Sequence, residues 1–144
     1  MHITLISTST FPSDQGIRTI SSVLKKTGHQ VNLVFMTLSE DYSRNYSFNE
    51  LKQLARICKN SELIGISAYA STRNRASRII RFLKRVFPSK KIVYGGVHAT
   101  ISPEDCIKHS DIVCVGEGEE AIIDLANALE KGKSIEKIKN LWVR

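Results

Sequence analysis

The fold is decided by residues 91–120, KIVYGGVHATISPEDCIKHSDIVCVGEGEE. Two short apolar runs in this stretch, IVY and IVCV, end at the glycine turns Gly95-Gly96 and Gly116-Glu117-Gly118. Short apolar runs that are rich in β-branched residues and followed by glycine are typical of strands buried on both faces. Both turns should therefore lie at one edge of a parallel sheet, where ligands bind outside the carboxyl ends of the strands. We expect this segment to form half of a wall against which a large flat cofactor lies.

Strands and helices alternate along the rest of the chain. The expected strands cover residues 2–7, 30–36, 63–69, 92–94 and 111–115. The expected helices begin near residues 16, 48, 71, 102 and 119. This alternation predicts a flavodoxin-like α/β fold, with a doubly wound five-stranded parallel sheet and helices on both faces. Residues 141–144 are a candidate for one more short edge strand.

The length and composition fit one domain with a real core. The chain has 144 residues, of which 42% are hydrophobic and 24% charged. Its 21 Lys and Arg against 14 Asp and Glu give a formal charge of +7, which raises the question of nucleic acid. Much of the excess lies between Arg73 and Lys91, and a local basic stripe is weak support for nucleic-acid binding. We expect the arginines of the helix over residues 71–86 to form a solvated surface and nucleic acid not to be a partner; docking to an acidic domain is the alternative.

The cysteines and the N-terminus indicate a cytoplasmic protein. Cys58, Cys106 and Cys114 are far apart and lack CxxC spacing, so buried free thiols in a reducing compartment are expected. The apolar N-terminus has no basic leader or cleavage site, and we interpret it as the first strand. No apolar run approaches the roughly 20 residues of a membrane span.

The loops at the ligand-binding edge exclude two common functions of this fold. A phospho-receiver domain needs clustered acidic residues after the first strand, where this chain has Ser7-Thr8-Ser9-Thr10. It also needs an aspartate at the end of the third strand, where this chain has Ser67-Ala68-Tyr69. A dinucleotide-binding fold needs GxGxxG in the same first loop, which contains only Gly16. A flavin or nucleotide-binding module stays open as the alternative, because the hydroxyls of residues 7–10 could bind a phosphate at the start of the first helix.

Two motifs favour a larger cofactor. Ser67 on the third strand and Gly95-Gly96 on the fourth resemble the Ser-x-Leu and Gly-Gly motifs that line the slot for the nucleotide tail in cobalamin-binding domains. The third position of the first motif is Tyr69 here, which could narrow the slot or stack on the tail. Two longer patterns, GGxHxTxxPE from Gly95 and DxVxxGEGE from Asp111, complete the signature. Together they are similar to the N-terminal cobalamin-binding domain of cobalamin-dependent radical S-adenosylmethionine enzymes, over almost the whole chain.

The resemblance implies a set of cofactor-binding residues at the carboxyl edge of the sheet, but no catalytic or metal-ligating residue. The set is Ser7, Thr8, Ser9, Thr10, Ser67, Ala68, Tyr69, Ser71, Thr72, Gly95, Gly96, Val97, His98, Gly116, Glu117 and Gly118. We expect the His98 ring to bond a loop carbonyl rather than cobalt. The dipole of the helix that Glu119 begins is a sufficient reason for this residue. We expect Glu117 either to order its loop or to contact another domain. For both glutamates, the alternative is cation binding or acid–base chemistry.

Two missing motifs refine the expected function. The chain has no Asp-x-His-x-x-Gly, the motif that supplies a histidine to the lower face of cobalt, so cobalamin is expected to bind base-off. It also has no CxxxCxxC to hold the iron–sulfur cluster that cleaves S-adenosylmethionine. We therefore expect residues 1–144 to be a single cofactor domain of a longer enzyme. Its radical S-adenosylmethionine domain would follow Arg144 and carry out methyl transfer or radical chemistry such as tetrapyrrole cyclisation.

Overall fold

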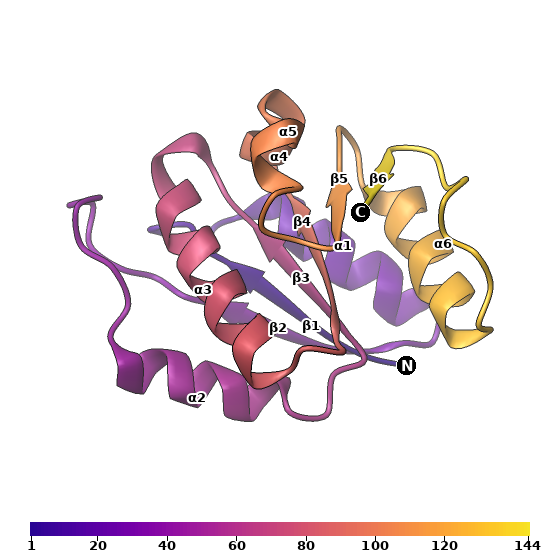
Figure 1. Cartoon of the computed structure of the whole chain (residues 1–144), viewed down its shortest axis with the longest axis horizontal. Coiled ribbons are helices and arrows are strands. Elements are labelled where there is room, and N and C mark those ends of the chain that lie inside the picture. Colours follow the sequence, from indigo (N-terminus) through magenta and orange to yellow (C-terminus); the bar gives the residue numbers. More distant parts are fainter.

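A six-stranded sheet runs through the computed structural model, which describes all 144 residues (Figure 1). The strands are β1 (His2–Ser7), β2 (Gln30–Phe35), β3 (Leu63–Ser67), β4 (Lys91–Gly95), β5 (Ile112–Cys114) and β6 (Leu141–Val143). The helices are α1 (Gln15–Lys26), α2 (Phe48–Cys58), the short 3₁₀ helix η1 (Ala70–Thr72), α3 (Arg73–Val86), α4 (Val97–Ile101), α5 (Pro103–Cys106) and α6 (Glu119–Glu130). The order β2-β1-β3-β4-β5 of the parallel strands is the flavodoxin-like order that the sequence predicts.

The prediction of five strands is wrong, because β6 adds an antiparallel sixth. Leu141 pairs with Cys114 and Val143 with Ile112. The chain after α6 runs back to the carboxyl edge before β6 begins, so β6 enters the sheet from that edge (Figure 1). Asn140, with φ 64°, makes the turn into β6, and its side-chain amide donates to the Glu117 carbonyl at 3.1 Å. The sixth strand thus holds the loop that follows β5.

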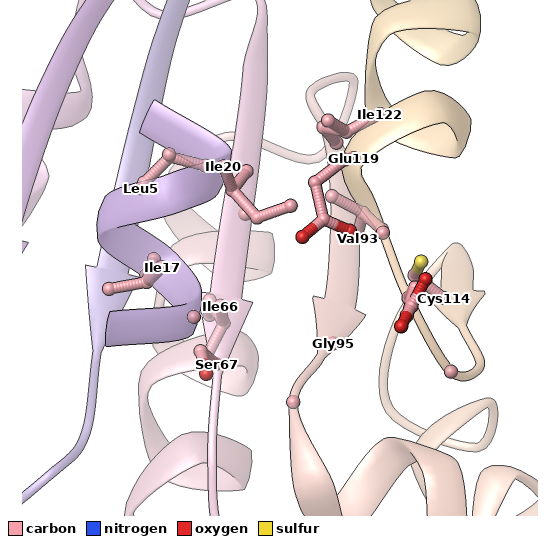
Figure 2. Close-up of a pocket in the computed structure, with 16 residues that line it drawn as sticks. Leu5, Ile17, Ile20, Ile66, Ser67, Val93, Gly95, Cys114, Glu119 and Ile122 are labelled. Carbon is pink, nitrogen blue, oxygen red and sulfur yellow. The ribbon is translucent and has the colours of Figure 1, made fainter. Parts of the chain in front are cut away.

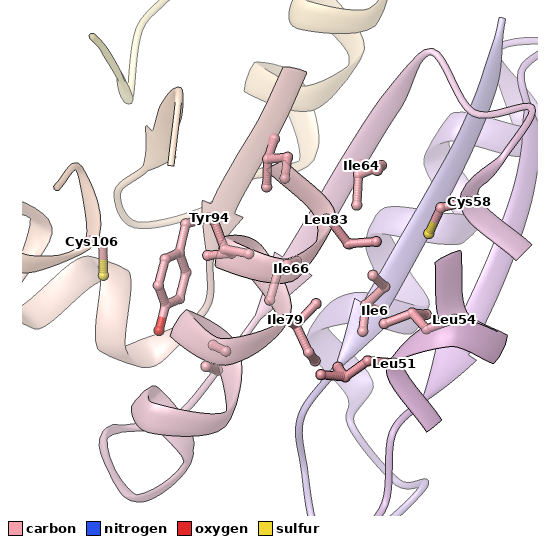
Figure 3. Packing of buried hydrophobic residues seen from close by; sticks show 14 of the residues in the cluster. Ile6, Leu51, Leu54, Cys58, Ile64, Ile66, Ile79, Leu83, Tyr94 and Cys106 are labelled. Atoms are coloured by element: carbon pink, nitrogen blue, oxygen red, sulfur yellow. The ribbon is translucent and has the colours of Figure 1, made fainter. Parts of the chain in front are cut away.

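Helices cover both faces of the sheet, as predicted. One buried cluster lies between the sheet and helices α2, α3, α4 and α5, and Figure 3 shows Ile66, Ile79 and Leu83 within it. A second cluster lies between the other face and helices α1 and α6. All three cysteines are free and buried, as expected. No helix has the length and apolar character needed to cross a membrane.

The arginines of α3, which the sequence predicts to form a solvated surface, are not all exposed to solvent. Arg81 and Arg85 are exposed as expected, but Arg75 is 1% exposed. Its guanidinium donates to the carbonyls of Ser39 at 2.8 Å, Asp41 at 2.9 Å and Arg44 at 3.2 Å. Periodicity alone could not reveal this, because the partners are main-chain atoms of an irregular segment.

Candidate cofactor site

A cavity of about 220 Å³ lies at the carboxyl edge, between the sheet and helices α1 and α6 (Figure 2). Its wall combines apolar side chains with bare main chain and a few polar groups. The lining consists of Leu5, Gly16, Ile17, Ile20, Gly65, Ile66, Ser67, Val93, Gly95, Gly96, Cys114, Gly116, Glu117, Gly118, Glu119 and Ile122. No Lys, Arg or His is among these residues. The strand register gives the cavity an outer row, Ser67 beside Gly95, and an inner row of Leu5, Gly65 and Val93.

Missing side chains on β3 and β4 keep the cavity open. A Cβ on Gly65 would lie 2.7 Å from Cδ2 of Leu5, so that side chain would have to shift. The nearest atom to a Cβ on Gly95 would be Cβ of Cys114, at 3.9 Å. A larger residue at position 95 would therefore extend into the cavity without striking the fold.

Gly96 has a different reason to be glycine. Its φ of 93° is a left-handed conformation that residues with a Cβ rarely adopt. A Cβ there would lie 2.7 Å from Oγ of Ser67 and 2.9 Å from the main chain of Ala68. Gly96 thus lets the chain leave β4 in contact with the end of β3, and its neighbour Gly95 leaves the space.

Hydroxyl groups line a second cavity, of about 350 Å³, between the loops that follow β1 and β3. Its lining consists of Ser9, Thr10, Phe11, Ser13, Asp14, Tyr42, Tyr69, Ser71 and Thr72. Tyr69 is 40% exposed there, and desolvation, followed by the Asp14 charge, raises the pKa of its phenol. The sequence gives no signal for Tyr42, which lies in the irregular segment that Arg75 holds. The Arg75 guanidinium lies 5.3 Å from the centre of its ring.

The first two hydroxyls of the first loop are engaged within the fold. Ser7 is buried and donates to Asp14 at 2.7 Å. Thr8 is also buried, and its hydroxyl donates to the Ser67 carbonyl at 3.0 Å and lies 2.8 Å from the Thr72 hydroxyl. Asp14, which sequence reasoning missed, accepts from the Ile17 amide at 3.3 Å and so caps α1. Ser7 and Thr8 therefore shape the loop, whereas Ser9 and Thr10 line the second cavity.

Besides Ser7 and Thr8, three further predicted residues, His98, Ala68 and Val97, line neither cavity. His98 is buried, with Nε2 3.3 Å from Asp105, and its ring centre lies 6.1 Å from that of Tyr94 on the α3 side of the sheet. Its ring is thus bonded to a carboxylate, where the sequence led us to expect a loop carbonyl. Ala68 is 1% exposed in the core, and Val97 is 48% exposed on α4.

Sequence reasoning also missed residues that do line the first cavity. Leu5, Ile17, Val93 and Ile122 follow the same apolar pattern as core residues, so nothing in the pattern separates a filled core from a hollow one. The dipole of α6 is a sufficient reason for Glu119 in the sequence, yet its carboxylate reaches into the cavity (Figure 2). The structure brings no three His, Cys, Asp or Glu side chains together as a metal-binding group.

Comparison with known proteins decides the family. The family model of the B12 binding domain matches residues 1–126. The chain belongs to the B12-binding domain family. The resemblance inferred from the serine and glycine motifs is thus confirmed.

Two curated proteins are similar to this B12-binding domain along most of its length. An anaerobic magnesium-protoporphyrin IX monomethyl ester cyclase of Synechocystis sp. is 28% identical over 143 residues, or 94% of the chain. An uncharacterized methyltransferase of Pyrococcus horikoshii is 26% identical over 131 residues, or 88% of the chain. The chain spans only 28% and 27% of the lengths of these two proteins.

A solved structure shares the fold. The radical S-adenosylmethionine methyltransferase TsrM from Kitasatospora setae, with cobalamin and a 4Fe-4S cluster bound, matches with a TM-score of 0.79 and 17% identity. The match covers 97% of this B12-binding domain and 28% of the TsrM chain. At this identity the likeness shows the fold.

Proposed function

We propose that this domain binds cobalamin base-off, with the nucleotide tail in the cavity between the sheet and helices α1 and α6. The observation that carries the proposal is the cavity itself, which Gly65 and Gly95 leave open beside β3 and β4. Pockets for whole drug-sized ligands measure roughly 300–1,000 Å³. A cavity of about 220 Å³ suits one arm of a large cofactor rather than the whole of it.

The residues present fit the corrin side of the cofactor as well. The second cavity offers the hydroxyls of Ser9, Thr10 and Ser71, which can exchange hydrogen bonds with the neutral amide groups at the rim of a corrin. Tyr69 adds a half-exposed aromatic ring at the same edge. The domain's task would be to hold and orient the ring, while bound cobalamin supplies a cobalt that carries a methyl group or assists a radical reaction.

The base-off mode rests on the positions of the four histidines. Neither cavity is lined by a histidine. His98 is bonded to Asp105, and His2 and His29 lie at the starts of β1 and β2, at the opposite edge of the sheet. His109 lies in the turn between α5 and β5. The lower face of cobalt would then meet water, a hydroxyl group or nothing from the protein.

We further propose that residues 1–144 act as one domain of a longer enzyme and present the cofactor to a radical S-adenosylmethionine domain. Support comes from the short share of its relatives that the chain spans and from the likeness to TsrM, itself a radical S-adenosylmethionine methyltransferase. Iron–sulfur and S-adenosylmethionine chemistry would belong to that other domain. Methyl transfer and tetrapyrrole cyclisation are both in keeping with the relatives.

The flavin alternative has lost the site that it needed. A flavin phosphate would bind at the start of α1, but the Asp14 carboxylate already accepts the Ile17 amide there. No cation lines the neighbouring cavity to offset a phosphate dianion.

Titration of the chain with methylcobalamin, followed by its visible spectrum, tests the proposal. We expect saturable binding with a shift to the base-off spectrum, and weak or no binding of flavin mononucleotide. An unchanged cobalamin spectrum together with tight flavin binding would overturn the proposed function.

A further inference from the structure

Glu119 has a carboxylate in a cavity whose lining includes no side chain of opposite charge. Figure 2 shows its side chain reaching from the start of α6 into the space between α1 and α6. None of the ion pairs of the chain involves it, and no Lys, Arg or His lines the cavity. Its charge contributes to the raised pKa of the Cys114 thiol, which places the two groups near each other. The carboxylate therefore has free acceptor capacity directed at whatever enters.

The polarity of the wall changes with depth. The outer row has the Ser67 hydroxyl and the bare main chain of Gly95, whereas the inner row has Leu5 and Val93. On the helix side, Glu119 begins α6 and Ile122 follows one turn further in. An entering arm would thus meet polar groups first, then a carboxylate, then an apolar end.

The nucleotide tail of cobalamin has the same order of chemical groups. From the corrin it carries a phosphodiester, then a sugar with free hydroxyls, then an aromatic base. An anionic phosphodiester beside an unneutralised carboxylate would be repelled, whereas a sugar hydroxyl is a hydrogen-bond donor that a carboxylate accepts. The complementary partner of Glu119 is therefore the sugar.

Resting on the proposed function, we propose that Glu119 accepts a hydrogen bond from a sugar hydroxyl of the nucleotide tail. It thereby makes the cavity selective for cobalamin over cobinamide, the corrinoid without a nucleotide tail. The bond would be charge-assisted and partly shielded from water, which makes it stronger than a neutral hydrogen bond.

The affinities of methylcobalamin and methylcobinamide, measured by spectral titration, test this assignment. Since hydrogen bonds to charged groups are the stronger class, we expect Glu119→Leu to weaken methylcobalamin binding about tenfold or more. Methylcobinamide binding should stay the same. Glu119→Gln keeps an acceptor oxygen and should lie between Glu119→Leu and the wild type for methylcobalamin.

Glu120→Leu is the matched control. Glu120 is the next residue in the first turn of α6, equally close to the helix dipole, but it is exposed and lines neither cavity. It should leave both affinities unchanged. If Glu119→Leu lowers the melting temperature, Glu119→Ala, a change to the best helix former, provides the same comparison.

Three results would contradict the assignment, and they separate it from the proposed function. Equal loss of methylcobalamin and methylcobinamide affinity in Glu119→Leu would mean that Glu119 does not read the tail. If the wild type prefers methylcobalamin and Glu119→Leu changes neither affinity, this assignment alone would be overturned. A wild type that binds both corrinoids equally would overturn the tail-binding cavity as well.

Discussion

At the scale of single residues, the two adjacent glycines after β4 do different work. Gly96 has the left-handed backbone, and a Cβ on it would lie only 2.9 Å from the main chain of Ala68, so it closes the turn. Gly95 has an ordinary backbone and open space beside it, so it leaves the cavity free. A substitution that tests the cavity therefore belongs at Gly95, because one at Gly96 would first disturb the fold.

We predict that Gly95→Val weakens methylcobalamin binding about 10- to 100-fold. Adding a side chain to a site that is already filled costs about 1–3 kcal/mol, which corresponds to roughly this loss of affinity. The valine side chain would occupy part of the cavity, and valine suits the end of a strand. Spectral titration measures the affinity, and urea unfolding should show little loss of stability.

Gly132→Ala is the control for this variant. Gly132 follows α6 at the end remote from the cavity and has φ 60°, so alanine should cost about 1 kcal/mol of unfolding free energy without changing cofactor affinity. Full-affinity binding by Gly95→Val would contradict the role given to Gly95.

Sequence reasoning at this scale found the positions where main chain is bare, but not the side chains around them. Ser67, Gly95, Gly96 and the glycine turn after β5 all line the first cavity. Gly65 escaped notice because a single glycine within a strand has several possible reasons, and only the packing of the Leu5 side chain against it shows that a Cβ there would not fit. His98 lies two residues after the glycine pair in the sequence, which favours a place at the site, yet its side chain is on the other face of the sheet.

At the scale of elements, α3 fixes an irregular segment as well as covering the sheet. Arg75 donates to three carbonyl groups of residues 39–44, and one of its terminal nitrogens remains buried without a partner. Tyr42, in the middle of that segment, lines the second cavity. The buried arginine thus links helix packing to the shape of the candidate site.

We predict that Arg75→Met destabilises the domain by about 2–4 kcal/mol, because it leaves three carbonyls without their charged donor. Urea denaturation gives the change in unfolding free energy. The matched change Arg85→Met, at an exposed position of the same helix, should stay within about 0.5 kcal/mol of the wild type. Equal stability of the two variants would show that the Arg75 bonds contribute little.

The elements themselves were largely predictable. Capping residues and apolar periodicity indicate the main helices, including the capping box of Ser47 and Glu50. Two features were not. Helix α4 begins at Val97, directly after the turn at Gly96. No side chain caps its start, so the sequence has no capping residue from which to predict it. The direction of β6 could not be read either, since three residues carry no signal for parallel or antiparallel pairing.

At the scale of the whole molecule, the two faces of the sheet have separate roles. The larger cluster, under α2 and α3, is filled and contains Cys58 and Cys106, each 0% exposed. The smaller cluster, under α1 and α6, opens at the carboxyl edge into the cavity that Cys114 lines. The parallel sheet and its two helix layers followed from the alternation of elements, whereas this difference between the two faces depends on packing that no local pattern encodes.

The position of Cys114 provides a reporter for the cavity. Burial, together with the Glu119 charge, raises the pKa of its thiol to about 11. The thiol is therefore neutral at about pH 8, and its alkylation rate should rise about tenfold per pH unit up to about pH 10, as the reactive thiolate fraction does. Iodoacetamide labelling followed by mass spectrometry checks this slope. A rate that is flat over this range would contradict the raised pKa.

The most direct test of tail binding is the alkylation rate of Cys114 at about pH 9 in the presence of saturating methylcobalamin or saturating methylcobinamide. If the tail occupies the cavity, methylcobalamin should slow the labelling of Cys114 at least about tenfold relative to methylcobinamide. Equal labelling rates with both saturating corrinoids would contradict the central claim that this cavity holds the nucleotide tail.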